Sequence, residues 1–266
     1  MQKVLGSGIF GPSDVFAGQY WMGVAVKISI VVPAFNEEKL LGASLGSISD
    51  AARVFTERGW AHELIVCDNN STDRTTEIAR AAGAKVVLEP VNQIARARNT
   101  GAAAATGDWL LFVDADSRPT RGLFEDAAAA MATGLYLAGG VTVRLDGSHL
   151  IAGFVTGLWN CLSRIFKWVA GSFIFCETTA FREIGGFDTN LYASEEINLS
   201  KRLKRLAQEK GRRLVILHRH PLATSDRKLH LYSYGEYARF LTRTLWHWGG
   251  TVRDQKSCHI WYDGRR

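Results

Sequence analysis

Two aspartates with one residue between them, Asp114 and Asp116, follow the apolar run from Trp109 to Val113. In an extended strand, residues two apart face the same side and lie about 6–7 Å from each other. Two like charges placed in this way repel each other unless a cation or hydrogen bonds lie between them. A hard divalent ion held by the pair and by substrate phosphates would explain it. A solvated turn that caps the strand is the alternative.

Polar residues also follow two earlier apolar runs, KISIVVPAF and HELIVCDNN. The first run should end near Pro33, because proline lacks the N–H group that a sheet ladder requires. The second run ends at Asp68, whose carboxylate could accept a hydrogen bond from a nucleotide base. The sequence DNNSTD is equally typical of a turn followed by a helix cap. Both interpretations of Asp68 stay open at this point.

A second acidic pair, Glu195 and Glu196, lies in the segment YASEEINL. Either carboxylate could remove a proton from a hydroxyl group that lies within ~3 Å of it. Two acids at the start of a helix also interact favourably with the helix dipole and then need no chemical role. The residues alone do not decide between these interpretations.

The elements that must position these groups alternate between strand and helix. Apolar runs predict strands at 27–35, 62–70, 84–90 and 108–116, and helical spacing predicts helices at 36–59, 71–83 and 92–107. This order implies parallel strands joined by right-handed crossovers. Ligands gather beyond the carboxyl ends of the strands in such sheets, so three strands would bring polar groups to one edge.

The second half of the chain is less regular. It predicts helices at 121–134 and 192–211 and strands at 137–145 and 212–217. Between them, residues 148–176 are long, apolar and aromatic. This segment could cover the sheet as core, or form an amphipathic surface that meets a membrane or a lipid-linked acceptor.

Composition limits the class of protein. The chain has 266 residues, 47% of them hydrophobic, and a net charge of +6, which suits anionic small molecules, lipid head groups or nucleic acid. Nucleic acid is disfavoured because no recognised stacking platform accompanies the basic residues. Four cysteines without a CxxC pair indicate a reducing compartment, and no apolar run reaches the ~18–20 residues of a membrane-spanning helix. We therefore expect a cytoplasmic protein.

Five blocks occur in the order typical of inverting family 2 glycosyltransferases: ISIVVPAFNEE, ELIVCDNNSTDRT, ARARNTGAAAATGDWLLFVDADSRP, FREIGGFD and SEEINLSKRL. The chain resembles this family over residues 27–230. The resemblance implies an α/β domain of GT-A fold, with a Rossmann-like, mostly parallel central sheet flanked by helices. Residues 27–120 would form its nucleotide-sugar-binding half and 121–230 its acceptor-binding and catalytic half. Residues 1–26 would be a tail outside the fold, and 231–266 an aromatic and basic extension.

The resemblance also implies a donor of UDP, GDP or dTDP type and a metal, Mg²⁺ or Mn²⁺. The expected donor-binding residues are Pro33, Ala34, Asn36, Glu37, Asp68, Asn70, Arg98 (with Arg96 as a rival) and Asp114. Asp116, together with Asp114, would bind the metal that bridges the diphosphate. The family's acidic motif usually ends in Glu-Asp. Glu196 stands at the Asp position and is the expected base, with Glu195 as its rival.

His218 and His220 follow the last predicted strand. The GT-A fold sometimes supplies a C-terminal histidine to the metal. A basic cluster on the surface is the favoured alternative for both residues.

These observations predict a metal-dependent, inverting transfer of a sugar to a hydroxyl of a saccharide or lipid-linked acceptor, in the cytoplasm or at the inner face of a membrane. One alternative is a nucleotidyltransferase of related fold, although PAFNEE lacks the glycine-rich basic loop that such enzymes need. Another is an inactive nucleotide-binding or membrane-surface protein. That alternative would be favoured if Glu195 and Glu196 pointed away from the aspartate pair. The sequence leaves the sugar, the base of the donor, the acceptor and the oligomeric state open.

Overall fold

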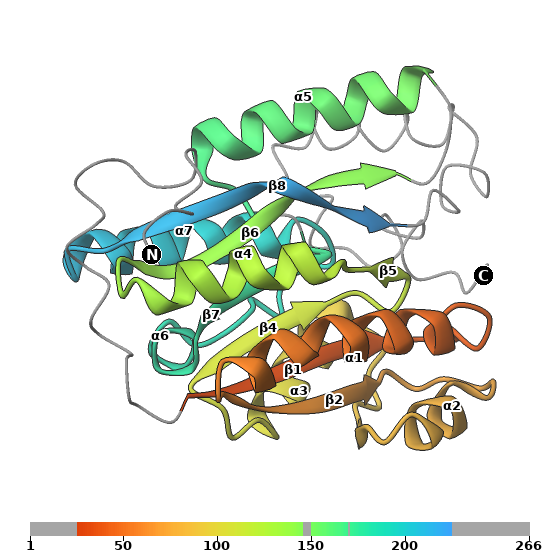
Figure 1. Ribbon diagram of the computed structural model, residues 1–266. Helices are drawn as coiled ribbons and strands as arrows, with labels where there is room; N and C mark the ends of the chain where they lie inside the picture. Colours follow the sequence, from red (N-terminus) through yellow and green to blue (C-terminus); the bar gives the residue numbers. More distant parts are fainter. Residues whose placement is uncertain (1–25, 146–149, 170, 225–266) are drawn as a thin grey trace, which may run out of the picture.

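A computed structural model describes residues 26–145, 150–169 and 171–224 (Figure 1). These residues form eight strands and seven helices. The expected C-terminal extension and nearly all of the expected N-terminal tail lie outside them. Val26, which we assigned to that tail, is buried in the core, and its carbonyl accepts a hydrogen bond from the Ala61 N–H (2.9 Å). None of the helices in these ranges is long and apolar enough to cross a membrane.

The strands form one sheet in the order β3-β2-β1-β4-β7-β6-β8-β5. The strands are β1 (Lys27–Ala34), β2 (Ala61–Asp68), β3 (Lys85–Leu88), β4 (Trp109–Val113), β5 (Ser117–Arg118), β6 (Tyr136–Leu145), β7 (Phe173–Glu177) and β8 (Arg213–Thr224). The helices are α1 (Leu41–Glu57), α2 (Thr75–Ala81), α3 (Ile94–Ala103), α4 (Arg121–Ala132), α5 (Leu150–Phe166), α6 (Thr178–Glu183) and α7 (Glu195–Glu209).

The first half of the chain forms the parallel part of the sheet. Strands β3, β2, β1 and β4 run parallel to one another, and Ala34 lies opposite Asp68 in the pairing of β1 with β2. The expected alternation of strands and helices is therefore confirmed. Because the strands are parallel, their carboxyl ends meet at one edge of the sheet.

The second half of the sheet is mixed. Strand β7 is antiparallel to both β4 and β6, whereas β6 and β8 are parallel. Strand β7 lies inside the long apolar segment, where continuous apolar composition gives no period that separates a strand from a helix. The short β5 pairs antiparallel with the end of β8.

Side chains of the central strands are buried on both faces of the sheet. In β1, Ile30 belongs to the cluster that includes α1 and α4, and Val31 to the cluster on the opposite face that includes α3, α6 and α7. Figure 1 shows α1 and α4 in front of the sheet. Strands that are covered on both faces read as continuous apolar runs, which is the pattern of KISIVV and WLLFV.

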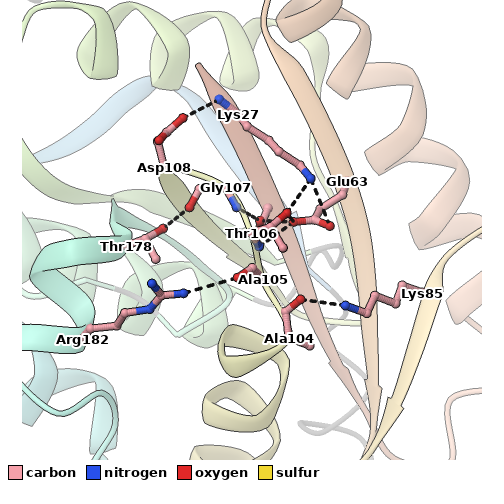
Figure 2. A network of polar contacts seen from close by, with 11 residues as sticks. Lys27, Glu63, Lys85, Ala104, Ala105, Thr106, Gly107, Asp108, Thr178 and Arg182 are labelled. Atoms are coloured by element: carbon pink, nitrogen blue, oxygen red, sulfur yellow. Dashed lines mark hydrogen bonds and ion pairs between the residues drawn. The ribbon is translucent and has the colours of Figure 1, made fainter. Parts of the chain in front are cut away.

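A polar network fixes the loop of residues 104–108 at the amino ends of the parallel strands (Figure 2). Glu63 Oε1 accepts hydrogen bonds from Ser29 Oγ (2.6 Å) and from Thr106 N and Oγ1 (both 2.8 Å). The Ser29 hydroxyl also accepts a hydrogen bond from the Gly107 N–H (2.8 Å). Burial opposes ionisation of Glu63, but the hydrogen bonds from Ser29 and Thr106 outweigh it and lower the pKa to about 2. The network holds the chain where it enters β4.

Replacing Glu63 with glutamine is expected to lower the free energy of unfolding at neutral pH by about 1–2 kcal/mol. The folded pKa of Glu63, about 2, lies below its ordinary value of 4.5, so its stabilisation is full above pH 4.5 and is lost toward pH 2. Urea denaturation across this range checks both points, with Glu77→Gln on the exposed side of α2 as the control. Equal acid sensitivity of wild type and Glu63→Gln would contradict the role of the network.

Candidate active site

A cleft of about 360 Å³ opens at the carboxyl ends of β1 and β4. Six separate stretches of chain line it, and they come from both halves of the chain. The lining residues are Pro33, Ala34, Phe35, Glu37, Asn69, Asn92, Ile94, Arg98, Asp114, Ala115, Asp116, Gly171, Ser172, Tyr192, Ala193, Ser194, Glu195 and Glu196. Both acidic pairs singled out from the sequence therefore face the same space.

The aspartate pair lies in a turn and not in a strand. Strand β4 ends at Val113, and the Ser117 N–H donates to the Asp114 carbonyl (3.1 Å). The expectation that the strand continues to residue 116 was wrong, because turn formation ends the ladder first. The Asp114 N–H donates to the Ser172 carbonyl (3.2 Å), which fixes the turn against the segment before β7. Asp114 and Asp116 meet at the cleft through this turn and not through strand periodicity.

Arg98 on α3 joins the two acidic pairs. Its guanidinium donates to Glu195 Oε1 (2.7 Å), Asp114 Oδ1 (2.9 Å) and the Gly171 carbonyl (3.0 Å). The Arg98 side chain is only 3% exposed and lies over the Phe187 ring, with its central carbon 5.2 Å from the ring centroid. Burial lowers the pKa of Arg98, but the charges of Asp114 and Glu195 outweigh it and raise the pKa overall. Arg98 therefore remains a permanent cation between the two pairs.

The two glutamates occupy different electrostatic environments. Glu195 is buried and paired with Arg98, whereas Glu196 is partly buried. Burial and the neighbouring Glu195 charge raise the pKa of Glu196 to about 8, even though Arg98 acts in the opposite direction. A carboxyl group with a pKa near the working pH is suited to proton transfer. Ser194, which precedes the pair, has a left-handed backbone (φ 62°) that begins α7 at Glu195.

Three expected donor-binding residues are not among those that line the cleft. The Asp68 carboxylate accepts hydrogen bonds from Ser71 N (3.0 Å) and from Thr76 Oγ1 (2.7 Å). Asn36 Oδ1 accepts from Thr72 N (2.8 Å), and Asn70, like Asn36, has a positive φ. The Asp68 and Asn36 side chains brace the loop between β2 and α2, in which Asn70 also lies, in line with the turn-and-cap interpretation of Asp68.

Asn69 lines the cleft where the sequence pointed to Asn70. The Asn69 amide donates to the carbonyls of Glu89 (3.1 Å) and Val91 (2.6 Å) and accepts from the Gln93 N–H (2.9 Å). Phe35 and Tyr192 also line the cleft and were missed, although both lie inside motifs that the sequence had singled out. Other missed residues come from segments without a motif, and these are Asn92, Ile94, Gly171 and Ser172.

Oxygen ligands for a cation are concentrated at the turn after β4. Within residues 26–145, 150–169 and 171–224, no three His, Cys, Asp or Glu side chains converge to hold a metal alone. Mg²⁺ and Mn²⁺ are commonly held by one or two carboxylates together with substrate phosphates. Asp114 and Asp116 fit such a shared site. His220 instead pairs with Asp126 on α4 (2.9 Å), and His218 lines a different hollow beside α5.

Residues 29–155 match the family model described as glycosyl transferase family 2. This part of the chain therefore has the sequence of a family 2 glycosyltransferase. The glucosyl-3-phosphoglycerate synthase of Mycolicibacterium smegmatis is 33% identical to this glycosyltransferase over 135 residues, which cover 48% of this chain and 40% of the relative. The aligned part of the chain spans 22–51% of the length of the curated relatives that it matches.

Two solved structures confirm the GT-A fold of this glycosyltransferase. A mannosyltransferase of Pyrobaculum calidifontis, in complex with GDP-Man and Mn²⁺, superposes with a TM-score of 0.63 at 19% identity, covering 89% of this chain and 65% of the other. Glucosyl-3-phosphoglycerate synthase of Mycobacterium tuberculosis, with Mn²⁺, UDP and glucosyl-3-phosphoglycerate, gives 0.58 at 22% identity, covering 92% and 87%. The family assignment replaces the nucleotidyltransferase alternative.

Replacing Arg98 with glutamine is expected to destabilise the glycosyltransferase by about 3–5 kcal/mol, because two carboxylates would lose their buried partner. Arg96 lies two residues away on the same helix, is exposed and donates to Gln93 Oε1 (3.1 Å). Arg96→Gln is the matched control and should change the free energy of unfolding by no more than about 0.5 kcal/mol. Urea denaturation without donor measures both.

The double variant Arg98→Gln/Glu195→Gln should recover part of the lost stability, since it also removes one unpaired carboxylate. Equal stability of the Arg98→Gln and Arg96→Gln proteins would contradict the bridging role of Arg98.

Proposed function

We propose that this glycosyltransferase moves a sugar from a nucleoside diphosphate to an acceptor hydroxyl, with a divalent cation and with inversion at the anomeric carbon. The observation that carries the proposal is a single cleft lined by both acidic pairs, Asp114 with Asp116 and Glu195 with Glu196. Solved structures of the same fold hold GDP-Man with Mn²⁺ and UDP with Mn²⁺, which supports a nucleotide-sugar donor. An inactive protein would have no need for the two pairs to share one space.

The net charge of the cleft supports the proposal that a divalent cation binds there. Its lining residues include five carboxylates and one cationic side chain, Arg98, whose charge is already shared by Asp114 and Glu195. A diphosphate entering this space would meet net negative charge. Mg²⁺ or Mn²⁺ held by Asp116 and Asp114 together with the diphosphate would supply the missing positive charge and stabilise the leaving group.

The donor would lie between the end of β1 and the turn after β4. Pro33, Ala34 and Glu37 line this part of the cleft, as the sequence predicted, and Asn69 joins them from the end of β2. Asp68 and Asn36 would act on the donor indirectly, by holding the shape of the adjacent loop, in which Asn70 lies. The identity of the nucleotide is left to experiment among UDP, GDP and dTDP.

The acceptor would approach the start of α7. Glu195 is occupied by Arg98, so Glu196 is the carboxylate that we assign to the acceptor hydroxyl. With a raised pKa, Glu196 can take the proton as the hydroxyl attacks the anomeric carbon. One base and one in-line attack invert the configuration, whereas retention would need a second nucleophile.

The compartment is proposed from the cysteines. Among the described residues, Cys67 and Cys176 are buried free thiols and Cys161 is an exposed free thiol. Free thiols of this kind persist in a reducing compartment, which supports the cytoplasm.

Asp116→Ala is expected to lower turnover at least about 100-fold, the usual scale for losing one group that stabilises transition-state charge. In wild type, UDP, GDP or dTDP should raise the melting temperature only when Mn²⁺ or Mg²⁺ is added. This cation-dependent shift should disappear in Asp116→Ala and persist in Asp50→Ala, an exposed control on α1. Nucleotide binding that depends on Mn²⁺ in Asp116→Ala as strongly as in wild type would contradict the assignment of Asp116 as a metal ligand.

Glu196→Gln is expected to lower the transfer rate by about 10²–10⁴-fold while leaving donor binding intact, because a general base is lost. Since the pKa of Glu196 is raised to about 8, the wild-type rate should rise with pH and level off above that value. Glu195→Gln removes a neighbouring negative charge, so the rising part of the pH–rate profile of this variant should move to lower pH. An unchanged pH–rate profile in Glu195→Gln, or full activity of Glu196→Gln, would contradict the assignment of Glu196 as the base.

A further inference from the structure

Helix α5 lies on the outer side of the second half of the sheet, beside β6 and β8 (Figure 1). Asn160 holds the helix to β6: its side-chain oxygen accepts from the Val143 N–H (3.0 Å), and its amide donates to the Val143 carbonyl (2.9 Å). Ser163 Oγ donates to the Trp168 carbonyl (2.5 Å), which fixes the chain where it leaves the helix. Hydrogen bonds to β6 and to the segment after the helix therefore fix the last turns of α5.

The outer surface of α5 is apolar. Leu158, Ile165 and Phe166 are 52%, 64% and 46% exposed, and Cys161 is exposed as well. Leu158, Cys161 and Ile165 follow each other at helical spacing, so they share one face. We call these four residues the α5 face. Large apolar side chains gathered in this way mark contact with another apolar body.

A hollow of about 590 Å³ lies next to the α5 face. Its polar lining includes Thr142, Asn160 and the basic side chains Arg164, Lys167 and His218, and we call this space the basic hollow. Thr142 is only 5% exposed, and its hydroxyl oxygen has no hydrogen-bond partner among the residues that the structure describes. A buried hydroxyl without a partner is costly, so this one is available to a ligand that enters the hollow.

Positive charge accumulates at the basic hollow. Burial lowers the pKa of Lys167, and the nearby charges of Arg164 and Lys204 lower it further. Among the described residues that line the hollow, none is acidic. An anionic group that bound here would relieve this repulsion and accept hydrogen bonds from Thr142, Arg164 and Lys167.

We propose that the basic hollow and the α5 face dock the protein on a membrane that contains anionic phospholipid. The lipid phosphate would enter the hollow, and the side chains of Leu158 and Ile165 would enter the boundary of the acyl chains. Free phosphate would match the hollow but not the apolar face beside it. A second copy of the chain is disfavoured, because a twofold contact would bring the cations of both copies together. The proposal goes beyond the sugar transfer and does not depend on it.

The proposed docking surface is connected to the cleft by a short stretch of chain. The chain that leaves α5 runs through Lys167 to Gly171 and Ser172, which line the cleft. A bilayer held at α5 would therefore contact the acceptor half of the enzyme. This arrangement suits an acceptor that carries a lipid anchor.

Co-sedimentation of the full chain with vesicles tests the proposal. Vesicles of phosphatidylcholine with added phosphatidylglycerol should bind the protein, and phosphatidylcholine alone should not. Arg164→Gln/Lys167→Gln should weaken binding about thirtyfold, the usual loss for two basic contacts with an anionic surface. The charge-matched control Arg53→Gln/Arg80→Gln, on α1 and α2, should change it by no more than about twofold. An equal loss in both double variants would overturn the docking site.

Two further variants test the separate parts of the surface. Leu158→Ser/Ile165→Ser should weaken vesicle binding without changing net charge, and the isosteric Thr142→Val should weaken it through loss of the buried hydroxyl. Circular dichroism checks that each variant is folded. Vesicle binding that is insensitive to both variants would overturn the proposal.

Thiol labelling distinguishes the source of the phosphate. Cys161 is exposed whereas Cys67 and Cys176 are buried, so a Cys258→Ser background makes Cys161 the thiol to follow. Anionic vesicles should slow the labelling of Cys161. Slowing by inorganic phosphate without sedimentation on vesicles would overturn membrane docking, as would dimerisation through the α5 face without vesicle binding. Hydrolysis of nucleotide sugar without vesicles reports on the transferase activity separately.

Discussion

The site depends on one buried cation held between two carboxylates. Arg98 reaches from α3 to Asp114 at the end of β4 and to Glu195 at the start of α7, over 2.9 and 2.7 Å. Two carboxylates in a partly buried space would otherwise repel each other and take up protons. Because Asp114 follows β4 in the first half of the chain and Glu195 begins α7 in the second half, the same ion pairs also hold these two segments together. The geometry of the cleft and the integrity of the fold are therefore coupled at Arg98.

This constraint divides the four acidic residues into two kinds. Asp114 and Glu195 share the charge of Arg98 and have fixed positions. Glu196 forms no ion pair with the residues that the structure describes, and burial and Glu195 raise its pKa to about 8 although the charge of Arg98 acts in the opposite direction. In our proposal the paired carboxylates position the site. Asp116, together with Asp114, would then hold the cation, and Glu196 would act on the acceptor. In this proposal a single arginine positions both the metal ligands and the base in one small cleft.

The sequence predicted the parallel half of the fold because each of its strands is a continuous apolar run that ends in polar residues. It also predicted that both acidic pairs belong to one site. It did not predict the pairing of Arg98 with Glu195, because such a contact between distant residues has no local signal. The sequence also could not show that Asp68 and Asn36 bind their own loop, for a related reason. A carboxylate or amide at the end of a strand can bind a ligand or its own loop equally well. Only the hydrogen bonds that Asp68 accepts from Ser71 and Thr76 show that it binds its loop.

Charge is segregated between the cleft and the surface around α5. The cleft is acidic, whereas the hollow beside α5 is basic, and the chain as a whole carries +6. An anionic donor free in solution would be drawn first to the basic surface, unless that surface is already occupied by other anions. Occupation of the basic hollow by lipid phosphate would leave the cation in the cleft as the stronger attraction for the diphosphate. Membrane contact at α5 would in this way favour correct binding of the donor without any change in the structure of the cleft.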